Sequence, residues 1–284
     1  MSTTEPRVIV DRLFQLGENP LWDDRRKVLF WTDIDAGELW KYDPKNEKAE
    51  RFYQGPKVGG FTLEEDGKLA LFRVDDISLI DPDNPEEILH LAPFSDENAA
   101  RFNDVMALPD GSVYAGTIAA KPGSGGLYHV GLDHSICELF LGTGVSNGMA
   151  LPDEHSLIWT CSTSRRIVRF ARDKLTNEIG QPTDLYMSPE AEGTPDGLCL
   201  DTEGHIWSAR WDGSAVIVHS PDGSPIRKVE IPTAKVTSVC FGGDSLSTLF
   251  ITTSDGPIYA MNTSTSGLLE NRSRLGLSRQ PDRP

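Results

Sequence analysis

Hydrophobic and polar residues alternate in short blocks that recur six times along the chain. Each copy contains an apolar stretch, a turn rich in Asp and Gly, and a second stretch rich in aromatic and β-branched residues. Short stretches of this composition, bounded by Gly, Pro, Asp or Asn, are typical of β-strands, and no segment has a helical period over a useful length. The copies begin near Leu21, Phe61, Val105, Met149, Leu198 and Val239.

The spacing of these copies predicts the fold class. Equivalent positions in successive copies lie 41 to 49 residues apart, a period that is typical of β-propellers, with several short strands in each unit. The sixth unit is one strand short, and the strand-like residues 7–10 precede the first unit without a partner. We therefore expect an all-β, six-bladed β-propeller whose ring is closed by the N-terminal strand, because that pairing removes two exposed sheet edges.

The propeller accounts for residues 1–262 as a single domain. Residues 263–284 form a polar C-terminal tail rich in Ser and Arg, with four leucines as its apolar residues. Terminal segments of this composition are often poorly ordered. We expect a poorly ordered tail, with a packed role as the alternative.

Charge and cysteine usage restrict the partners and the compartment. The chain has 43 acidic and 27 basic residues, a formal net charge of −16, which argues against binding to nucleic acid or to anionic membranes. No apolar run approaches the ~20 residues of a membrane helix, and residues 1–5 lack the features of a secretory signal. The four cysteines are widely separated, and we interpret them as small buried residues of a cytoplasmic protein. The sequence leaves the oligomeric state open.

Oxygen-bearing side chains occupy nearly the same phase in four of the six copies. The innermost strands of a propeller begin at one mouth of the ring, so equal phase predicts convergence in space. Carboxylates and amides suit a divalent cation, whereas the absence of His and Cys argues against a high-affinity zinc or copper site. Ordinary turn residues are the alternative interpretation. The positions are Glu18, Asn103 with Asp104, Asn147 and Asp196, while Gly59 and Thr237 have the same phase and bring no carboxylate.

Six stretches of this chain resemble, in order, those of a known propeller family. They are residues 16–22, 101–104, 115–117, 146–148, 195–197 and 237–243. The family is that of gluconolactonase, regucalcin (senescence marker protein) and luciferin-regenerating enzyme, which are six-bladed propellers. The resemblance implies that Glu18, Asn147 and Asp196 bind one divalent metal ion and that Arg101 and Asn103 face the substrate. It also implies hydrolysis of small-molecule lactones, commonly those of sugar acids.

These implications give a metal-dependent lactonase as the expected function. A divalent ion would polarise the carbonyl of a sugar-acid lactone or a related lactone and stabilise the oxyanion that forms on attack by water. We expect Asp196 to accept the proton of that water, with Asp104 as a second candidate. Calcium is the expected ion, and zinc, magnesium, manganese and ferrous iron are alternatives.

One departure from the family pattern bears on the substrate. After Thr117 the chain has Ile118, Ala119, Ala120 and Lys121 where members that act on sugars often carry acidic residues. A second expectation is therefore a lactone that has fewer hydroxyl groups than a sugar-acid lactone, or one that carries a negative charge. Two other functions stay open, namely a calcium-binding propeller without catalysis and a metal-dependent hydrolase of phosphoesters or organophosphates.

Overall fold

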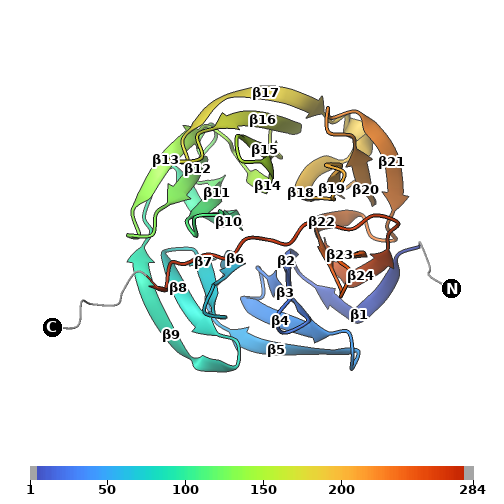
Figure 1. The fold of residues 1–284 in the computed structure, drawn as a ribbon, viewed down its shortest axis with the longest axis horizontal. Coiled ribbons are helices and arrows are strands. Elements are labelled where there is room, and N and C mark those ends of the chain that lie inside the picture. The colour runs from blue at the N-terminus through green and yellow to red at the C-terminus, as the bar shows by residue number, and fades with distance from the viewer. Residues whose placement is uncertain (1–4, 278–284) are drawn as a thin grey trace.

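The computed structural model describes residues 5–277 of the chain. These residues form six four-stranded antiparallel sheets, which are arranged as blades around a common axis (Figure 1). The expected all-β, six-bladed propeller is confirmed. The structure also contains a short 3-10 turn, η1 (Glu190–Glu192).

The first three blades run in chain order from the innermost strand outwards. Blade 1 contains β2 (Gly17–Asp23), β3 (Val28–Asp33), β4 (Glu38–Asp43) and β5 (Lys48–Gln54). Blade 2 contains β6 (Val58–Leu63), β7 (Leu69–Arg73), β8 (Asp76–Asp81) and β9 (Asn84–Pro93). Blade 3 contains β10 (Ala99–Ala107), β11 (Val113–Ala119), β12 (Gly126–Val130) and β13 (Ile136–Leu141).

The remaining blades follow the same plan until the last one. Blade 4 contains β14 (Ser146–Asp153), β15 (Ser156–Cys161), β16 (Arg166–Arg172) and β17 (Ile179–Met187). Blade 5 contains β18 (Thr194–Leu200), β19 (Ile206–Trp211), β20 (Ala215–His219) and β21 (Pro225–Glu230). Blade 6 contains β22 (Lys235–Gly242), β23 (Thr248–Ser254), β24 (Gly256–Asn262) and the N-terminal strand β1 (Arg7–Phe14).

The N-terminal strand closes the ring, as the sequence predicts. β1 pairs antiparallel with β24, with Arg7 opposite Ala260 and Val8 opposite Tyr259. The sixth blade thus takes its outer strand from the start of the chain. Because β1 and β24 are the first and last strands of the propeller, their backbone hydrogen bonds hold the two ends of its sequence together.

The hydrophobic core lies between neighbouring blades. Trp207 of blade 5 packs against Phe241 of blade 6, with ring centroids 5.4 Å apart and planes at 83°, an edge-to-face geometry that aromatic pairs favour. Three cysteines are buried, as expected, but Cys137 is exposed. The exception arises because Cys137 lies on β13, the outermost strand of its blade.

Residues 263–277 pack across the ring, which corrects the expectation of a poorly ordered tail for this part of the chain. Gly267 bridges to Asp201 and Ser273 bridges to Glu64, and Leu275 is fully buried. The polar composition was misleading because the partners of these polar residues are side chains and carbonyls on distant blades. The rest of the predicted tail, residues 278–284, lies outside the described residues. We call residues 263–277 the strap.

The innermost strands define two faces of the ring. They begin on what we call the site face, which carries Glu18, Asn103, Asn147 and Asp196. They end on the strap face, where Leu268 donates a backbone hydrogen bond to Leu200 at the end of β18. No helix within residues 5–277 is long and apolar enough to cross a membrane.

Candidate functional site

Each of the six innermost strands has a register irregularity near its start. A β-bulge inserts a residue and redirects side chains away from the regular alternation. The positions of equal phase in the sequence fall in or beside these bulges. In blades 1, 3, 4 and 5 the bulge presents an oxygen-bearing side chain at the site face. The irregularities lie between Glu18 and Leu21, Val58 and Gly60, Phe102 and Val105, Ser146 and Met149, Pro195 and Leu198, and Val236 and Ser238.

The five side chains predicted for metal and substrate lie together. Glu18, Arg101, Asn103, Asn147 and Asp196 all line one cavity of about 320 Å³ on the site face. This size is within the usual range for small-molecule sites. The rest of the cavity wall is formed by Leu16, Ile34, Ile118, Val145, Ser162, Thr194 and Trp211.

The two positions without a carboxylate have structural roles. A side chain at Gly59 would collide with the backbone of blade 3, because its Cβ would lie 2.0 Å from the Phe102 carbonyl oxygen. Thr237 Oγ1 donates to the Gly17 carbonyl at 2.6 Å and thereby joins blade 6 to blade 1. These blades therefore use the same phase for packing against a neighbour.

A left-handed turn fixes Glu18 at the start of β2. Asn19 has φ of 48°, a conformation that Asn tolerates better than most residues. Its backbone N–H donates to Glu18 Oε2 at 2.9 Å, and its own Oδ1 accepts from the backbone N–H of Phe61 at 2.5 Å. Asn19 thus holds the Glu18 carboxylate through its backbone and is itself held to blade 2 through its side chain.

Asn147 and Asp196 each present a buried oxygen without a partner. Asn147 Nδ2 donates to Ser162 Oγ at 3.1 Å, and Ser162 Oγ donates to the Pro195 carbonyl at 2.8 Å. Asn147 Oδ1 and Asp196 Oδ1 have no hydrogen-bond partner among the described residues. Buried acceptors of this kind are unfavourable unless a ligand satisfies them, and hard oxygens from adjacent strands fit a divalent cation.

Arg101 is held by its own strand. Its Nη1 donates to Asn103 Oδ1 at 2.7 Å and to the Phe102 carbonyl at 2.8 Å. Asn103 Nδ2 in turn donates to the Ser146 carbonyl of blade 4 at 3.0 Å. The guanidinium is therefore oriented at the cavity wall by an amide that is itself anchored to the next blade.

The carboxylates at the site face are in an unfavourable environment when no cation is bound. Burial raises the pKa of Glu18 to about 8, and repulsion from Asp104 adds to the rise. Burial likewise raises the pKa of Asp104 to about 7. The pKa of Asp196 lies well above its usual range through burial and the charges of Glu18 and Asp104. A bound cation would relieve this repulsion.

The donor set of this site is small. Its candidate ligands are the carboxylates of Glu18 and Asp196 and the amide of Asn147. Within residues 5–277, no group of three or more His, Cys, Asp or Glu side chains is arranged to hold a metal ion. Asp104 is absent from the cavity wall. Its negative charge nevertheless contributes to the raised pKa values of Glu18 and Asp196.

Sequence reasoning missed most of the cavity wall. Ser162 lies in a polar run of Ser and Thr that has nothing to distinguish it, and Trp211 resembles the other strand aromatics. Ile118, noted as a departure from the family pattern, does line the cavity, whereas Lys121 does not. The Lys121 backbone instead donates to Ser124 Oγ at 3.1 Å.

Comparison with known proteins identifies similar sequences over nearly the whole ring. A family model described as "SMP-30/Gluconolactonase/LRE-like region" matches residues 16–255. A pentonolactonase of Haloferax volcanii is 35% identical over 253 residues, which cover 87% of this chain and 84% of that protein. A 6-deoxy-6-sulfogluconolactonase of Pseudomonas putida is 34% identical over 247 residues, covering 84% of this chain and 83% of that protein.

The fold is also similar to solved structures. Regucalcin from Agrobacterium tumefaciens, described as a calcium-binding protein, has a TM-score of 0.89 to this chain. The similarity covers 96% of this chain and 98% of that one, at 24% sequence identity.

Proposed function

This chain belongs to the SMP-30/gluconolactonase/LRE-like family, and on that premise we propose that it is a metal-dependent lactonase. Family membership confirms the resemblance noted in the sequence, and relatives at 35% and 34% identity are named as lactonases. The observation that carries the proposal is the pair of buried, unpartnered oxygens, Asn147 Oδ1 and Asp196 Oδ1, in a cavity that Glu18 also lines.

In this proposal Glu18, Asn147 and Asp196 hold one divalent ion, with calcium as the expected ion. When bound there, such an ion would supply Lewis-acid polarisation of the lactone carbonyl and would stabilise the negative charge that develops on its oxygen. Support for a hard cation comes from the all-oxygen donor set. The name of the regucalcin structure, a calcium-binding protein, agrees with this choice.

The chain's own residues then orient the substrate and move a proton. Water adds to the carbonyl carbon while Asp196 accepts a proton from it. The ring C–O bond breaks, and the released oxygen takes up that proton to give a hydroxy acid. Arg101, fixed by Asn103 Oδ1 and the Phe102 carbonyl, is positioned to donate hydrogen bonds to substrate hydroxyls or to the product carboxylate.

The apolar part of the wall bears on the choice of lactone. Leu16, Ile118 and Trp211 line the same cavity as the polar groups. A substrate hydroxyl held against them would lose its hydrogen bonds to water, at a cost of roughly 1–3 kcal/mol. We therefore propose a sugar-acid lactone or related lactone whose face towards these residues has few hydroxyl groups.

A lactone panel assayed before and after treatment with a chelator tests this function. We expect turnover of at least one sugar-acid or deoxy-sugar lactone, loss of that turnover on metal removal, and recovery on adding calcium. Phosphoester and organophosphate substrates run in parallel address the alternative hydrolase. Full activity without metal would contradict the metal dependence, and calcium binding without turnover of any lactone would favour a binding protein.

A further inference from the structure

A second cavity lies between blades 6 and 1 on the strap face. Its volume is about 520 Å³, which is within the usual range for small-molecule sites. One wall comes from β1, β23 and β24 of blade 6, and the other comes from β2, β4 and the turns that follow them in blade 1. Among the described residues, none lines both this cavity and the one at the site face. The closure of the ring by β1 thus creates a separate space for a ligand.

The buried part of the cavity wall is aromatic. Trp22, Tyr42 and Phe250 line the cavity, and all three side chains are buried. The rings of Trp22 and Phe250 are stacked, with centroids 5.7 Å apart and planes at 17°. Stacked rings present a flat apolar surface, against which the apolar part of a ligand can pack.

Hydrogen-bond donors in the cavity wall lack partners. Trp22 is 5% exposed, and its Nε1 has no hydrogen-bond partner among the described residues. A buried donor in this state is unfavourable unless a ligand satisfies it. The Arg7 guanidinium and the Lys45 ammonium also line the cavity, and neither forms a hydrogen bond or an ion pair within residues 5–277. The cavity therefore offers donors to a ligand that brings acceptors.

The carboxylates in the cavity wall, by contrast, are paired. Asp244 Oδ1 lies 3.4 Å from Lys27 Nζ. Asp43 accepts from the backbone N–H of Lys45 at 2.8 Å and from Asn46 Nδ2 at 2.5 Å. Four basic and two acidic side chains line the cavity, so its local charge is positive in a chain whose net charge is −16. This reversal of charge favours an anionic ligand.

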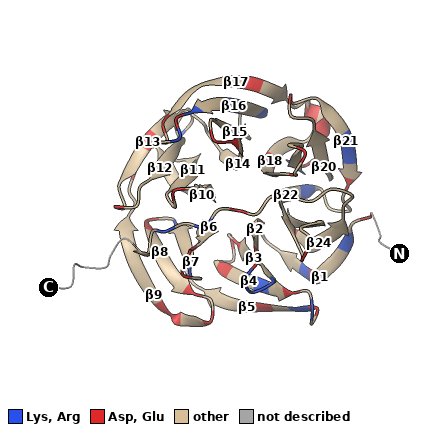
Figure 2. Ribbon diagram, viewed as in Figure 1, with Lys and Arg blue, Asp and Glu red and all other residues tan. Residues whose placement is uncertain are grey.

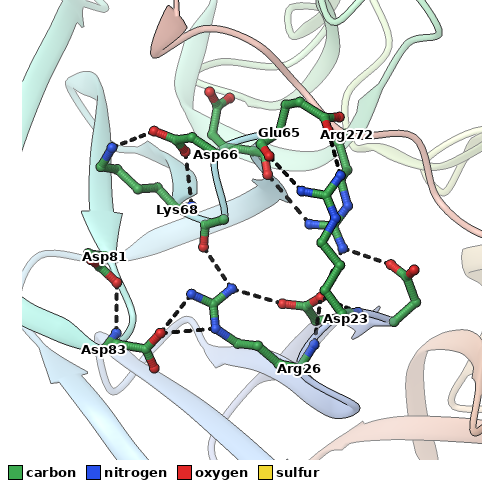
Figure 3. A network of polar contacts seen from close by, with 12 residues as sticks. Asp23, Arg26, Glu65, Asp66, Lys68, Asp81, Asp83 and Arg272 are labelled. Atoms are coloured by element: carbon green, nitrogen blue, oxygen red, sulfur yellow. Dashed lines mark hydrogen bonds and ion pairs between the residues drawn. The ribbon is translucent and has the colours of Figure 1, made fainter.

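Arg26, at the border of the cavity, is already engaged. Its Nη1 donates to Asp23 Oδ2 at 3.0 Å, and its Nη2 donates to Asp83 Oδ2 at 2.7 Å (Figure 3). Asp23 also accepts from Arg272 Nη2 at 2.8 Å, a contact that anchors the strap at this edge. Arg26 therefore shapes the cavity, and the charges that are free for a ligand are those of Arg7 and Lys45.

We propose that this cavity binds a small organic anion, a molecule with a flat apolar body and one carboxylate or phosphate group. Arg7 and Lys45 bind the anionic group through charge-assisted hydrogen bonds. The apolar body lies against the aromatic wall, where Trp22 supplies the third donor. An inorganic ion alone would leave most of the 520 Å³ and the apolar wall unoccupied. The site is separate from the proposed lactone site and does not depend on that function.

Nuclear magnetic resonance of the full-length protein labelled with ¹⁵N-tryptophan tests the inference. The chain has six tryptophans, and Trp22→Phe identifies the indole signal of Trp22. Phenyl phosphate and benzoate are titrated in chelator, which keeps divalent ions away from the site face. We expect both anions to shift the Trp22 signal in a saturable way. Benzyl alcohol lacks the charge and inorganic phosphate lacks the apolar body, so each should bind roughly tenfold or more weakly than phenyl phosphate.

Arg7→Gln and Lys45→Gln remove the free charges one at a time. Each should raise the Kd for phenyl phosphate roughly tenfold, as expected for the loss of a hydrogen bond to a charged group. Lys48→Gln is the matched control, because Lys48 begins the next strand, β5, pairs with Glu50 at 3.1 Å and is absent from the cavity wall. It should bind phenyl phosphate as the wild type does, and thermal unfolding checks that each variant is folded.

A Trp22 signal that does not move with either anion would overturn the proposal, as would an unchanged Kd in folded Arg7→Gln and Lys45→Gln. An equal rise in Lys48→Gln would also overturn it, since net charge alone would then explain the binding. Benzyl alcohol or inorganic phosphate that binds as tightly as phenyl phosphate would contradict the proposed ligand class. A shift confined to the indole signal of Trp211 would place the anion in the cavity at the site face instead.

Discussion

The two ends of β2 carry carboxylates in opposite circumstances. Glu18, at the site face, accepts one backbone hydrogen bond, and burial raises its pKa to about 8. Asp23, at the strap face, is also buried, which by itself would raise its pKa. Hydrogen bonds from Arg272, Arg26 and the backbone outweigh that effect and hold the pKa of Asp23 below its usual range. β2 thus begins with an acid that accepts one backbone hydrogen bond and ends with an acid that is paired with both Arg26 and Arg272 (Figure 3).

The same contrast extends across the ring. Asn147 and Asp196 have unpartnered oxygens at the site face. At the strap face, by contrast, the Glu64 carboxylate accepts three hydrogen bonds from the strap. Figure 2 shows that basic and acidic residues are spread over the blades and their connections. The two faces differ in how these buried oxygens are paired. Polar groups that the fold satisfies stabilise it, and those that it leaves unsatisfied indicate where a ligand binds.

Replacing Asp196 should have the largest effect on activity. Asp196→Asn removes both the proton acceptor and a charge from the proposed metal site. We expect kcat/KM for the preferred lactone to fall roughly 10²- to 10³-fold, as when another electrostatic contribution to a transition state is removed. The metal-free variant should be at least as stable as the wild type, because a buried, repelled carboxylate has gone. If Asp196→Asn instead caused a large drop in Tm and kept its activity, Asp196 would serve stability rather than catalysis, which would contradict our assignment.

Breaking the strap anchor should instead reduce stability. Arg272→Ala leaves Asp23 with Arg26 as its remaining cationic partner, and we expect a loss of about 1–3 kcal/mol in the free energy of unfolding. Arg25→Ala is the control, since the Arg25–Glu65 pair is 47% exposed on both sides and should contribute little. Urea unfolding measures both, and equal effects of the two variants would contradict the anchoring role.

Ser162→Ala should weaken metal binding by a smaller factor. Ser162 Oγ accepts from Asn147 Nδ2, which fixes the amide so that its oxygen points away from Ser162. We expect the calcium Kd to rise roughly tenfold, as for other residues that orient a metal ligand. Ser164→Ala, in the same turn, is the matched control, and an unchanged Kd in Ser162→Ala would show that Asn147 needs no such support.

The metal-free protein should become less stable as the pH rises. Glu18, Asp104 and Glu270 have folded-state pKa values of about 8, 7 and 7, each raised chiefly by burial. An acid whose pKa is raised in the folded state favours folding below its ordinary pKa, which is 4.5 for Glu18 and Glu270 and 3.8 for Asp104. This contribution is lost as the pH increases through the folded-state pKa. Tm measured in chelator should fall between pH 5 and pH 8, and calcium should raise Tm more at pH 8 than at pH 5. A Tm that rises steadily over this range in chelator would contradict the assignment.

The convergence of Glu18, Asn147 and Asp196 on one cavity could be predicted from the sequence, whereas the packing of the strap could not. Glu18, Asn147 and Asp196 could be found because the repeat places one bulge at the same phase in each blade. Glu270 and Arg272 have no counterpart in the repeat, and their partners lie far away in sequence, such as Asp104 and Asp23. The sequence of a polar tail does not reveal whether the blades provide buried hydrogen-bond partners for it.

Anomalous diffraction from crystals of the active protein grown with manganese tests the central claim most directly. The account predicts one strong peak on the site face, within coordination distance of Glu18, Asn147 Oδ1 and Asp196 Oδ1. A peak bound elsewhere, or none in protein that hydrolyses a lactone, would contradict it.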